Sequence, residues 1–356
     1  MLADISPPTQ PAVPCGLVGY GRMGHLIERN LGPRAEIALR VDPKFAGIEA
    51  SPCNVATLDD ATHFANTMPR HWFICTPTEK HLSDLQSVAR LAPGASIMVE
   101  KPLCAPNDLQ QASTLLRSEH VSYIRVNNHY ADCRNLEIAQ KILSSISRRI
   151  KQVEVCFFKD RRQDEESGRF IDRELGVWGY EGFHMLTLLY GLLPEPDRYA
   201  HQSGLGVYRF QAAGNHQCGL VSEYARLPSG VETILSTSTN GVCLGPDHKP
   251  AWRLRHGERL RRVRIQCDGG IAVALEFGRS RNSALRPGAV FTVALKYASG
   301  GGSRIVLSDN PLRRHIGRFL DRTLSHHSEL DFAIRLTHRL RVLASGTHSS
   351  QTVKVA

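Results

Sequence analysis

A short glycine string near the N-terminus constrains the fold more than any other feature of this sequence. Residues 19–24 read Gly-Tyr-Gly-Arg-Met-Gly, after an apolar run at 15–18 and at the start of an amphipathic stretch at 22–31. Asp42 closes the next β-rich run, 36–41. Glycines at this spacing between a strand and a helix, with an acidic residue after the second strand, are typical of a parallel α/β unit that binds a dinucleotide.

The three glycines have separate expected roles. Gly19 permits a tight turn, Gly21 lets the backbone approach a pyrophosphate, and Gly24 allows the helix to pack closely on the strand. The amino end of the helix adds N–H donors that attract phosphate groups. We therefore expect the pyrophosphate of a dinucleotide to be held by Gly19, Tyr20, Gly21, Arg22 and Met23.

Asp42 is expected to discriminate between the two nicotinamide cofactors. Its carboxylate would accept hydrogen bonds from the adenosine ribose hydroxyls and repel a 2′-phosphate, which favours NAD over NADP. Arg40 and Lys44 flank Asp42 and weaken that preference, so NADP stays open as an alternative.

The length of 356 residues favours two domains, because single cores rarely grow past about 250–300 residues. The predicted fold class is α/β: a Rossmann dinucleotide-binding domain at 1–128, then an α+β domain at 129–356 that binds substrate and oligomerises through an open, mostly antiparallel sheet. Strands are expected at 15–18, 36–41, 71–75, 96–99, 123–126, 152–158, 219–224, 231–238, 263–266, 290–295 and 352–355. Helices are expected at 22–31, 80–91, 107–119, 135–145 and 329–344.

Composition excludes several classes of protein. No apolar run approaches the roughly 20 residues of a membrane-spanning helix, so no membrane partner is expected. Residues 1–14 hold four prolines and no basic segment, which indicates a loose leader and not a signal peptide. Nine cysteines without a close pair exclude a zinc ribbon, so no metal site is predicted, and they indicate reduced thiols in a cytoplasmic protein.

The chain carries a formal net charge of +10. Arginines are frequent at 253–264, where they fit either the outward positions of a solvated strand pair or attraction of an anionic small molecule such as a phosphorylated or nucleotide-linked sugar. Nucleic acid is not an expected partner, because no recognition motif and no interleaved aromatic residues accompany the charge.

Two further strands end in residues that suit a ligand site. Thr76-Pro77 follows the run 71–75, and Glu100-Lys101 follows the run 96–99. Ligands collect at the carboxyl ends of parallel strands, so these loops should line the cofactor site. The expected contacts are Thr76, Pro77, His81, Glu100 and Lys101. The plain alternatives are a turn at Thr76-Pro77 and a surface Glu-Lys pair.

The segments 72–81 and 99–103 together resemble the glucose–fructose oxidoreductase/inositol dehydrogenase/MocA family, in which a Thr-Pro turn precedes a histidine and a Glu-Lys-Pro motif follows. The resemblance implies an oxidoreductase whose Lys101 contacts cofactor and substrate and helps to move a proton. It continues through Gly182-Phe183-His184 and the C-terminal stretches 331–345 and 352–355, and so covers essentially the whole chain.

His184 is, by this resemblance, the catalytic histidine of the second domain, carried on a helix. The family has an Asp four residues before it and another three residues after it, where this sequence has Tyr180 and Thr187. Glu181 is placed one residue off, on a different part of the helix surface. Tyr180 is therefore expected to take part in proton transfer or substrate binding with Lys101 and His184. The alternatives are a core histidine and a site that has lost dehydrogenase activity.

The substrate pocket is expected where the chain crosses into the second domain. Asn128-His129-Tyr130 also resembles the Asp-His-Tyr segment of glucose-6-phosphate dehydrogenases, although a polar interdomain hinge is the alternative. Trp178 could supply a flat wall for a sugar ring. The expected substrate residues are Asn128, His129, Tyr130, Trp178 and His184.

The sequence is compatible with three functions. The first is NAD-dependent oxidation of a hydroxyl on a sugar, aminosugar or cyclitol, in a biosynthetic pathway. The second is reduction of a C=N or C=O bond in a biosynthetic intermediate, for which a tyrosine is a suitable proton donor. The third is a dinucleotide-binding sensor or scaffold without turnover. An open sheet with one uncovered face favours a homodimer or homotetramer.

Overall fold

The computed structural model describes residues 11–46, 53–167, 172, 174–214, 219–245, 248–255, 258–278, 289–349 and 352–355. The first ten residues of the expected leader and Cys218 lie outside these ranges. The chain forms two compact units. The first unit comprises Met1–Asn127 and Leu312–Ile334, and the second comprises Asn128–Pro311 and Arg335–Ala356. Residues 312–334, which the sequence placed in the second domain, thus cluster with the first.

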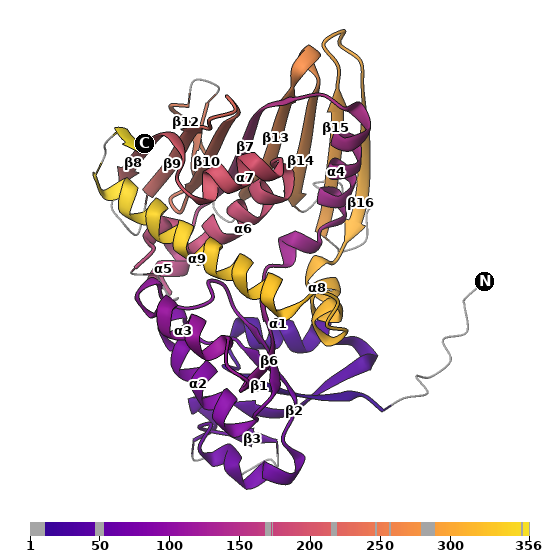
Figure 1. The fold of residues 1–356 in the computed structure, drawn as a ribbon, viewed down its shortest axis with the longest axis vertical. Helices are drawn as coiled ribbons and strands as arrows, with labels where there is room; N and C mark the ends of the chain where they lie inside the picture. The colour runs from indigo at the N-terminus through magenta and orange to yellow at the C-terminus, as the bar shows by residue number, and fades with distance from the viewer. Residues whose placement is uncertain are drawn as a thin grey trace, which may run out of the picture. The chain divides into compact units, whose positions relative to one another are not determined.

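The first unit contains a six-stranded parallel sheet with the strand order β3-β2-β1-β4-β5-β6. Strands β1, β2, β3 and β6 of this sheet are labelled in Figure 1. This is the order of a Rossmann fold, which confirms the prediction. Its strands are β1 Val13–Val18, β2 Ala35–Val41, β3 Asn54–Val55, β4 His71–Ile74, β5 Ala95–Val99 and β6 Val121–Val126. Its helices are α1 Arg22–Asn30, α2 His81–Leu91, α3 Leu109–Leu116 and α8 Pro311–Leu320. The short 3-10 turns are η1 Gly32–Arg34, η2 Pro43–Phe45, η3 Asp60–Thr67, η4 Thr78–Lys80 and η5 Pro106–Asp108.

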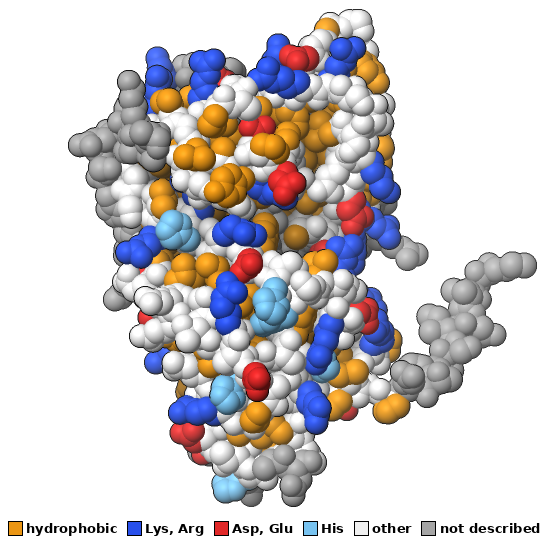
Figure 2. All heavy atoms as spheres, in the orientation of Figure 1, with side chains coloured by type: hydrophobic (Ala, Val, Ile, Leu, Met, Phe, Trp, Pro, Cys, Tyr) orange, Lys and Arg blue, Asp and Glu red, His pale blue; other side chains and the backbone are white. Residues whose placement is uncertain are grey.

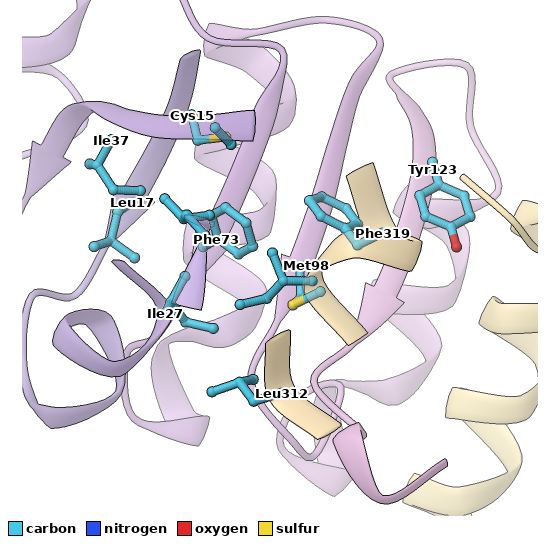
Figure 3. Close-up of a cluster of buried hydrophobic side chains, with 12 residues drawn as sticks. Cys15, Leu17, Ile27, Ile37, Phe73, Met98, Tyr123, Leu312 and Phe319 are labelled. Atoms are coloured by element: carbon cyan, nitrogen blue, oxygen red, sulfur yellow. The ribbon is translucent and has the colours of Figure 1, made fainter. Parts of the chain in front are cut away.

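Helix α8 completes the core of the first unit, although it lies far along the chain. Leu312, Ile316 and Phe319 are buried in the same cluster as side chains of β1, β2, β4, β5 and β6. Figure 3 shows Phe319 between Phe73 and Tyr123, with ring centroids 5.4 Å and 6.0 Å away. Helix α8 was not among the helices predicted from the sequence. Its apolar side chains explain why the segment clusters with the N-terminal residues.

The second unit contains a nine-stranded sheet with the order β16-β15-β14-β13-β7-β10-β9-β8-β17. All neighbours are antiparallel except β7 and β10, which confirms the mostly antiparallel sheet. Its strands are β7 Ile150–Lys159, β8 Gly206–Gly214, β9 Gly219–Arg226, β10 Glu232–Ser238, β13 Arg259–Cys267, β14 Ala272–Gly278, β15 Ala289–Lys296, β16 Gly302–Asp309 and β17 Thr352–Val355. A separate hairpin pairs β11 Val242–Leu244 with β12 Pro250–Arg253.

Helix α6, Gly176–Leu192, packs against β7 and β10, and α4, Arg134–Ile146, packs against β14 and β15. Fifteen of the 17 residues of α6 are buried, so it is a core helix and not a surface one. The remaining elements are α5 Arg162–Glu166, α7 Glu195–Gln202, α9 His326–Ser349, η6 His129–Asp132 and η7 Asp268–Gly270. The division between the two units falls inside α9.

On the face drawn in Figure 2, Lys and Arg side chains are spread among acidic and apolar ones. They do not gather into one large basic patch on that face. Among the described helices, none combines the length and apolarity that crossing a membrane requires.

Candidate functional site

The glycine turn of the first unit has the backbone that the sequence predicts. Gly19 has φ +85°, and a Cβ there would lie 2.9 Å from the backbone N of Thr76. A Cβ on Gly24 would lie 2.5 Å from the carbonyl oxygen of Gly19, so helix α1 packs directly on the turn. Gly21 differs, because its Cβ position has no described atom within 4 Å. The turn is therefore tightly packed at Gly19 and Gly24. At Gly21 it leaves space for the approach of a pyrophosphate.

Gly21 also precedes the first residue of α1, and among the described residues no side chain caps that helix end. The first N–H groups of a helix have no partner within the helix itself and carry a partial positive charge. Arg22 is exposed and Met23 is half-buried beside them. This end of α1 can accept an anionic group.

Asp42 is anchored beside the turn by its own carboxylate. One oxygen accepts the N–H of Tyr20 at 2.6 Å, and the other accepts the N–H of Lys44 at 3.0 Å. A carboxylate offers about four acceptor positions, so two remain for the hydroxyls of a ribose. Asp42 is half-buried and faces the same turn as Gly19, as NAD recognition requires.

The two cations that flank Asp42 have different surroundings. Arg40 forms an ion pair with Glu28, which also accepts the hydroxyl of Tyr20 at 2.5 Å. The exposed Lys44 donates to the carbonyl of Tyr20 at 2.5 Å and lies 4.3 Å from the centre of its ring. Glu28 therefore offsets the charge of Arg40, and Lys44 remains the cation next to Asp42.

The loop after β4 is tied to the loop after β5 by His81. Its Nε2 lies 3.0 Å from the carbonyl oxygen of Thr76, and its Nδ1 lies 2.9 Å from that of Pro102. The side chain is 1% exposed, and burial lowers its pKa. His81 was expected to contact the cofactor, but the structure gives it a supporting position, in which it holds the two loops. Thr76 donates to Asp84 at 2.6 Å, and Pro77 is exposed.

Glu100 and Lys101 follow β5, and Asn127 follows β6. The amide of Asn127 donates to the Glu100 carboxylate. Burial raises the pKa of Glu100, while the hydrogen bond from Asn127 and the charge of Lys101 act in the opposite direction. Lys101 is half-buried.

The predicted cofactor residues of the first unit share one edge of its sheet. They follow β1, β2, β4 and β5, and these strands are parallel. The carboxyl ends of all four strands therefore meet on one side, which is where doubly wound sheets bind ligands.

In the second unit, two predicted residues, His129 and Tyr130, lie against His184. The centre of its ring lies 4.9 Å from that of His129 and 4.7 Å from that of Tyr130. The rings of His129 and Tyr130 are 4.8 Å apart. Asn128 is held from α6, since its side-chain oxygen accepts the hydroxyl of Thr187 at 2.8 Å. Thr187, which occupies the position of the second expected Asp, therefore holds the side chain of Asn128, the residue before His129.

Two arginines that pair with Glu181, Arg161 and Arg261, were not among the predicted site residues. Glu181 precedes His184 by three positions, and residues at this spacing share a helix face. Its carboxylate accepts Arg161 at 2.8 Å and Arg261 at 2.6 Å, and Arg261 also donates to the hydroxyl of Tyr130 at 2.7 Å. The carboxylate is therefore linked through Arg261 to the ring beside His184, although Glu181 lies one residue away from the position of the expected Asp. Alternation along β13, where Arg261 faces opposite to Arg262, was the available signal.

Two aromatic residues of α6 have different environments. Tyr180 is half-buried, and the guanidinium of Arg161 lies 4.6 Å from the centre of its ring. Trp178 is 1% exposed, so the expectation that it forms a wall for a sugar ring is wrong. It packs inside the unit, where a Cβ on Gly182 would lie 3.3 Å from Trp178 and 2.7 Å from Leu340. In the described part of the chain, no group of three or more metal-ligating side chains is placed to hold an ion.

Neither a protein-family model nor a curated protein matches the sequence. Solved structures do match in fold. UDP-N-acetylglucosamine 3-dehydrogenase GnnA from Acidithiobacillus ferrooxidans gives a TM-score of 0.67 at 13% identity over 95% of this chain and 99% of that one. GenD2 from gentamicin A biosynthesis, in complex with NAD, gives 0.66 at 15% identity over 98% and 97%. A putative myo-inositol dehydrogenase from Sinorhizobium meliloti gives 0.66 at 16% identity over 97% and 100%. The chain therefore has the fold of these oxidoreductases, a Rossmann unit together with a unit built on a large, mostly antiparallel sheet.

Proposed function

We propose that this protein is an NAD(P)-dependent oxidoreductase that acts on a hydroxyl or keto carbon of a sugar, aminosugar or cyclitol. The observation that carries the proposal is the glycine turn with Asp42 anchored beside it, open at Gly21 and closed at Gly19 and Gly24. The matching structures, among them a complex with NAD, a dehydrogenase of a nucleotide-linked aminosugar and a putative inositol dehydrogenase, support the substrate class.

The chain's own residues have separate proposed roles in binding and catalysis. When bound, the nicotinamide accepts or supplies the hydride. Gly21 and the amino end of α1 would hold the pyrophosphate, and Asp42 would accept hydrogen bonds from the ribose hydroxyls. Lys101 would donate a hydrogen bond to the sugar of the bound cofactor. His184 would take the proton from the substrate hydroxyl during oxidation and return it during reduction.

A second candidate function, reduction of a C=O or C=N bond, is favoured by the tyrosine beside His184. Burial raises the pKa of Tyr130 to about 12, with Glu181 adding to that effect and Arg261 opposing it. The phenol therefore stays protonated at neutral pH. A protonated phenol can donate to a developing alkoxide or amide but cannot act as a base, which suits the reductive direction.

Two measurements on the purified protein test the proposal. Fluorescence titration with NADH and NADPH measures cofactor binding, and absorbance at the NADH band follows turnover on a panel of sugars, aminosugars, cyclitols and their keto forms. We expect tighter binding of NADH and release of NADH with at least one hydroxyl substrate. Consumption of NADH with ketones or imines alone selects the reductase. Tight binding without turnover selects the sensor, and absence of binding to either cofactor contradicts the proposal.

A further inference from the structure

We propose that Arg261 and Glu181 are positioning residues, which fix the ring of Tyr130 and through it the imidazole of His184. The inference rests on the proposed function, since that assigns the proton transfer to His184. Neither Arg261 nor Glu181 was among the predicted site residues.

The contacts form a closed path that starts and ends on α6. Glu181 of α6 accepts Nη2 of Arg261 at 2.6 Å, and Nη1 of the same guanidinium donates to the Tyr130 hydroxyl at 2.7 Å. The Tyr130 ring then lies 4.7 Å, centre to centre, from the ring of His184, one helical turn after Glu181. Helix α6 therefore holds both the histidine and the anchor of the ring that packs on it.

The guanidinium suits this role because its donors have a fixed planar arrangement. One nitrogen is bound to the carboxylate and the other to the phenol, so the Tyr130 oxygen cannot move without breaking one of these hydrogen bonds. The guanidinium also lies 5.8 Å from the centre of the Tyr130 ring and 5.4 Å from that of Phe157. Arg161, on the other side, donates to the same oxygen of Glu181 at 2.8 Å and keeps the carboxylate in place.

The burial of the ion pair between Glu181 and Arg261 indicates a role beyond stabilising the fold. Glu181 is 3% exposed and Tyr130 is 5% exposed. Desolvating a carboxylate at that depth, together with the guanidinium of Arg261, whose side chain is 16% exposed, costs free energy that apolar side chains of similar size would not cost. A role in orienting neighbouring side chains explains their presence better than stability does.

The first test observes the position of His184 without requiring catalysis. The full-length protein is labelled with ¹³C at histidine Cε1, and the His184 resonance is identified from its loss in His184→Gln. We expect Arg261→Ala and Tyr130→Phe to shift that resonance, because the ring that packs on His184 loses its anchor. Arg262→Ala is the matched control: it is the next residue of β13, faces away from Arg261, and lies 3.8 Å from Glu154. Equal shifts in Arg261→Ala and Arg262→Ala, or none in either, would overturn the proposal.

The second test measures the consequence for turnover. Small displacements of a catalytic group cost up to about 100-fold in rate, so Arg261→Ala should lower kcat about 10- to 100-fold with little change in KM. Added guanidinium should restore part of that loss, and Arg261→Lys should fall between Ala and the wild type. An unchanged kcat, or a loss that guanidinium does not restore while the melting temperature drops, contradicts the positioning role. If Arg261→Ala shifts the His184 resonance but the wild type turns over no substrate, the link from Arg261 to His184 is supported. The proposed function is then rejected.

Discussion

Replacing Asp42 tests how this chain selects its cofactor. Its two carboxylate oxygens each accept one backbone N–H, from Tyr20 at 2.6 Å and from Lys44 at 3.0 Å, and retain acceptor capacity for a ribose. Asp42→Ala removes those acceptors and the negative charge that opposes a 2′-phosphate. Hydrogen bonds to charged groups contribute about 1.5–3 kcal/mol each. We therefore expect the preference for NADH over NADPH to shrink by about 1–3 kcal/mol, a factor of about 5–150.

Asp42→Asn separates the charge of this residue from its support of the turn. Asparagine keeps one side-chain oxygen, so it can still accept one of the two N–H groups, but it has no charge to repel a phosphate. If the charge decides, both variants lose discrimination, whereas support of the turn alone would let Asn keep most of the NADH affinity. Fluorescence titration with both cofactors measures this, and thermal unfolding shows whether the turn survives. A wild-type protein that binds NADPH as tightly as NADH would refute the reasoning.

Four further predictions concern catalysis and stability. Lys101→Ala and His184→Ala should each lower kcat by about 10²–10⁴ with nucleotide affinity nearly unchanged; unchanged activity per folded His184→Ala molecule would make the histidine a core residue. Tyr180→Phe should slow the reductive reaction about 10-fold without loss of stability, as steady-state rates and melting curves can check, and a wild-type rate would remove Tyr180 from the mechanism. Phe319→Ala should destabilise the first unit by about 3–5 kcal/mol in urea unfolding, because its ring is fully buried, and a loss well below 1 kcal/mol would contradict that packing. Burial lowers the pKa of His81, so on acidification this histidine takes up a proton in the unfolded chain at a higher pH than in the folded one. The free energy of unfolding should therefore fall as the pH drops below about 6.5. His81→Gln should flatten that slope in denaturation curves measured from pH 7 to pH 5, and an unchanged slope would show that other groups cause it.

Local patterns predicted the first unit well because each of its elements has a local signature. The glycine string, the alternation of strands and helices, and Asp42 at the end of β2 all lie within a short stretch of chain. Helix α6 lacks such a signature, because a helix buried on nearly every side shows no amphipathic period. That is also why Trp178 was misread: the sequence did not reveal that its side of the helix faces the interior.

The parts of the candidate site that were missed depend on pairing between distant strands. The arginine run at 253–264 is one pattern in sequence, but β13 turns Arg261 toward Tyr130 and Arg262 toward Glu154. Only the register of β13 against β7 determines which arginine meets Glu181. Strand β16 was missed for a different reason, since most of its residues are exposed and give no clear alternation.

The position of α8 has a consequence for synthesis. Phe73 and Tyr123 are translated early, but Phe319, whose ring packs against both, leaves the ribosome only after every strand from β7 to β16. We therefore expect the nascent Rossmann sheet to expose that apolar surface for most of translation, and exposed surface of this kind is prone to aggregation. A chain that stops at residue 311 lacks part of an N-terminal core and not merely a C-terminal tail, so we expect such a fragment to aggregate through its first 127 residues.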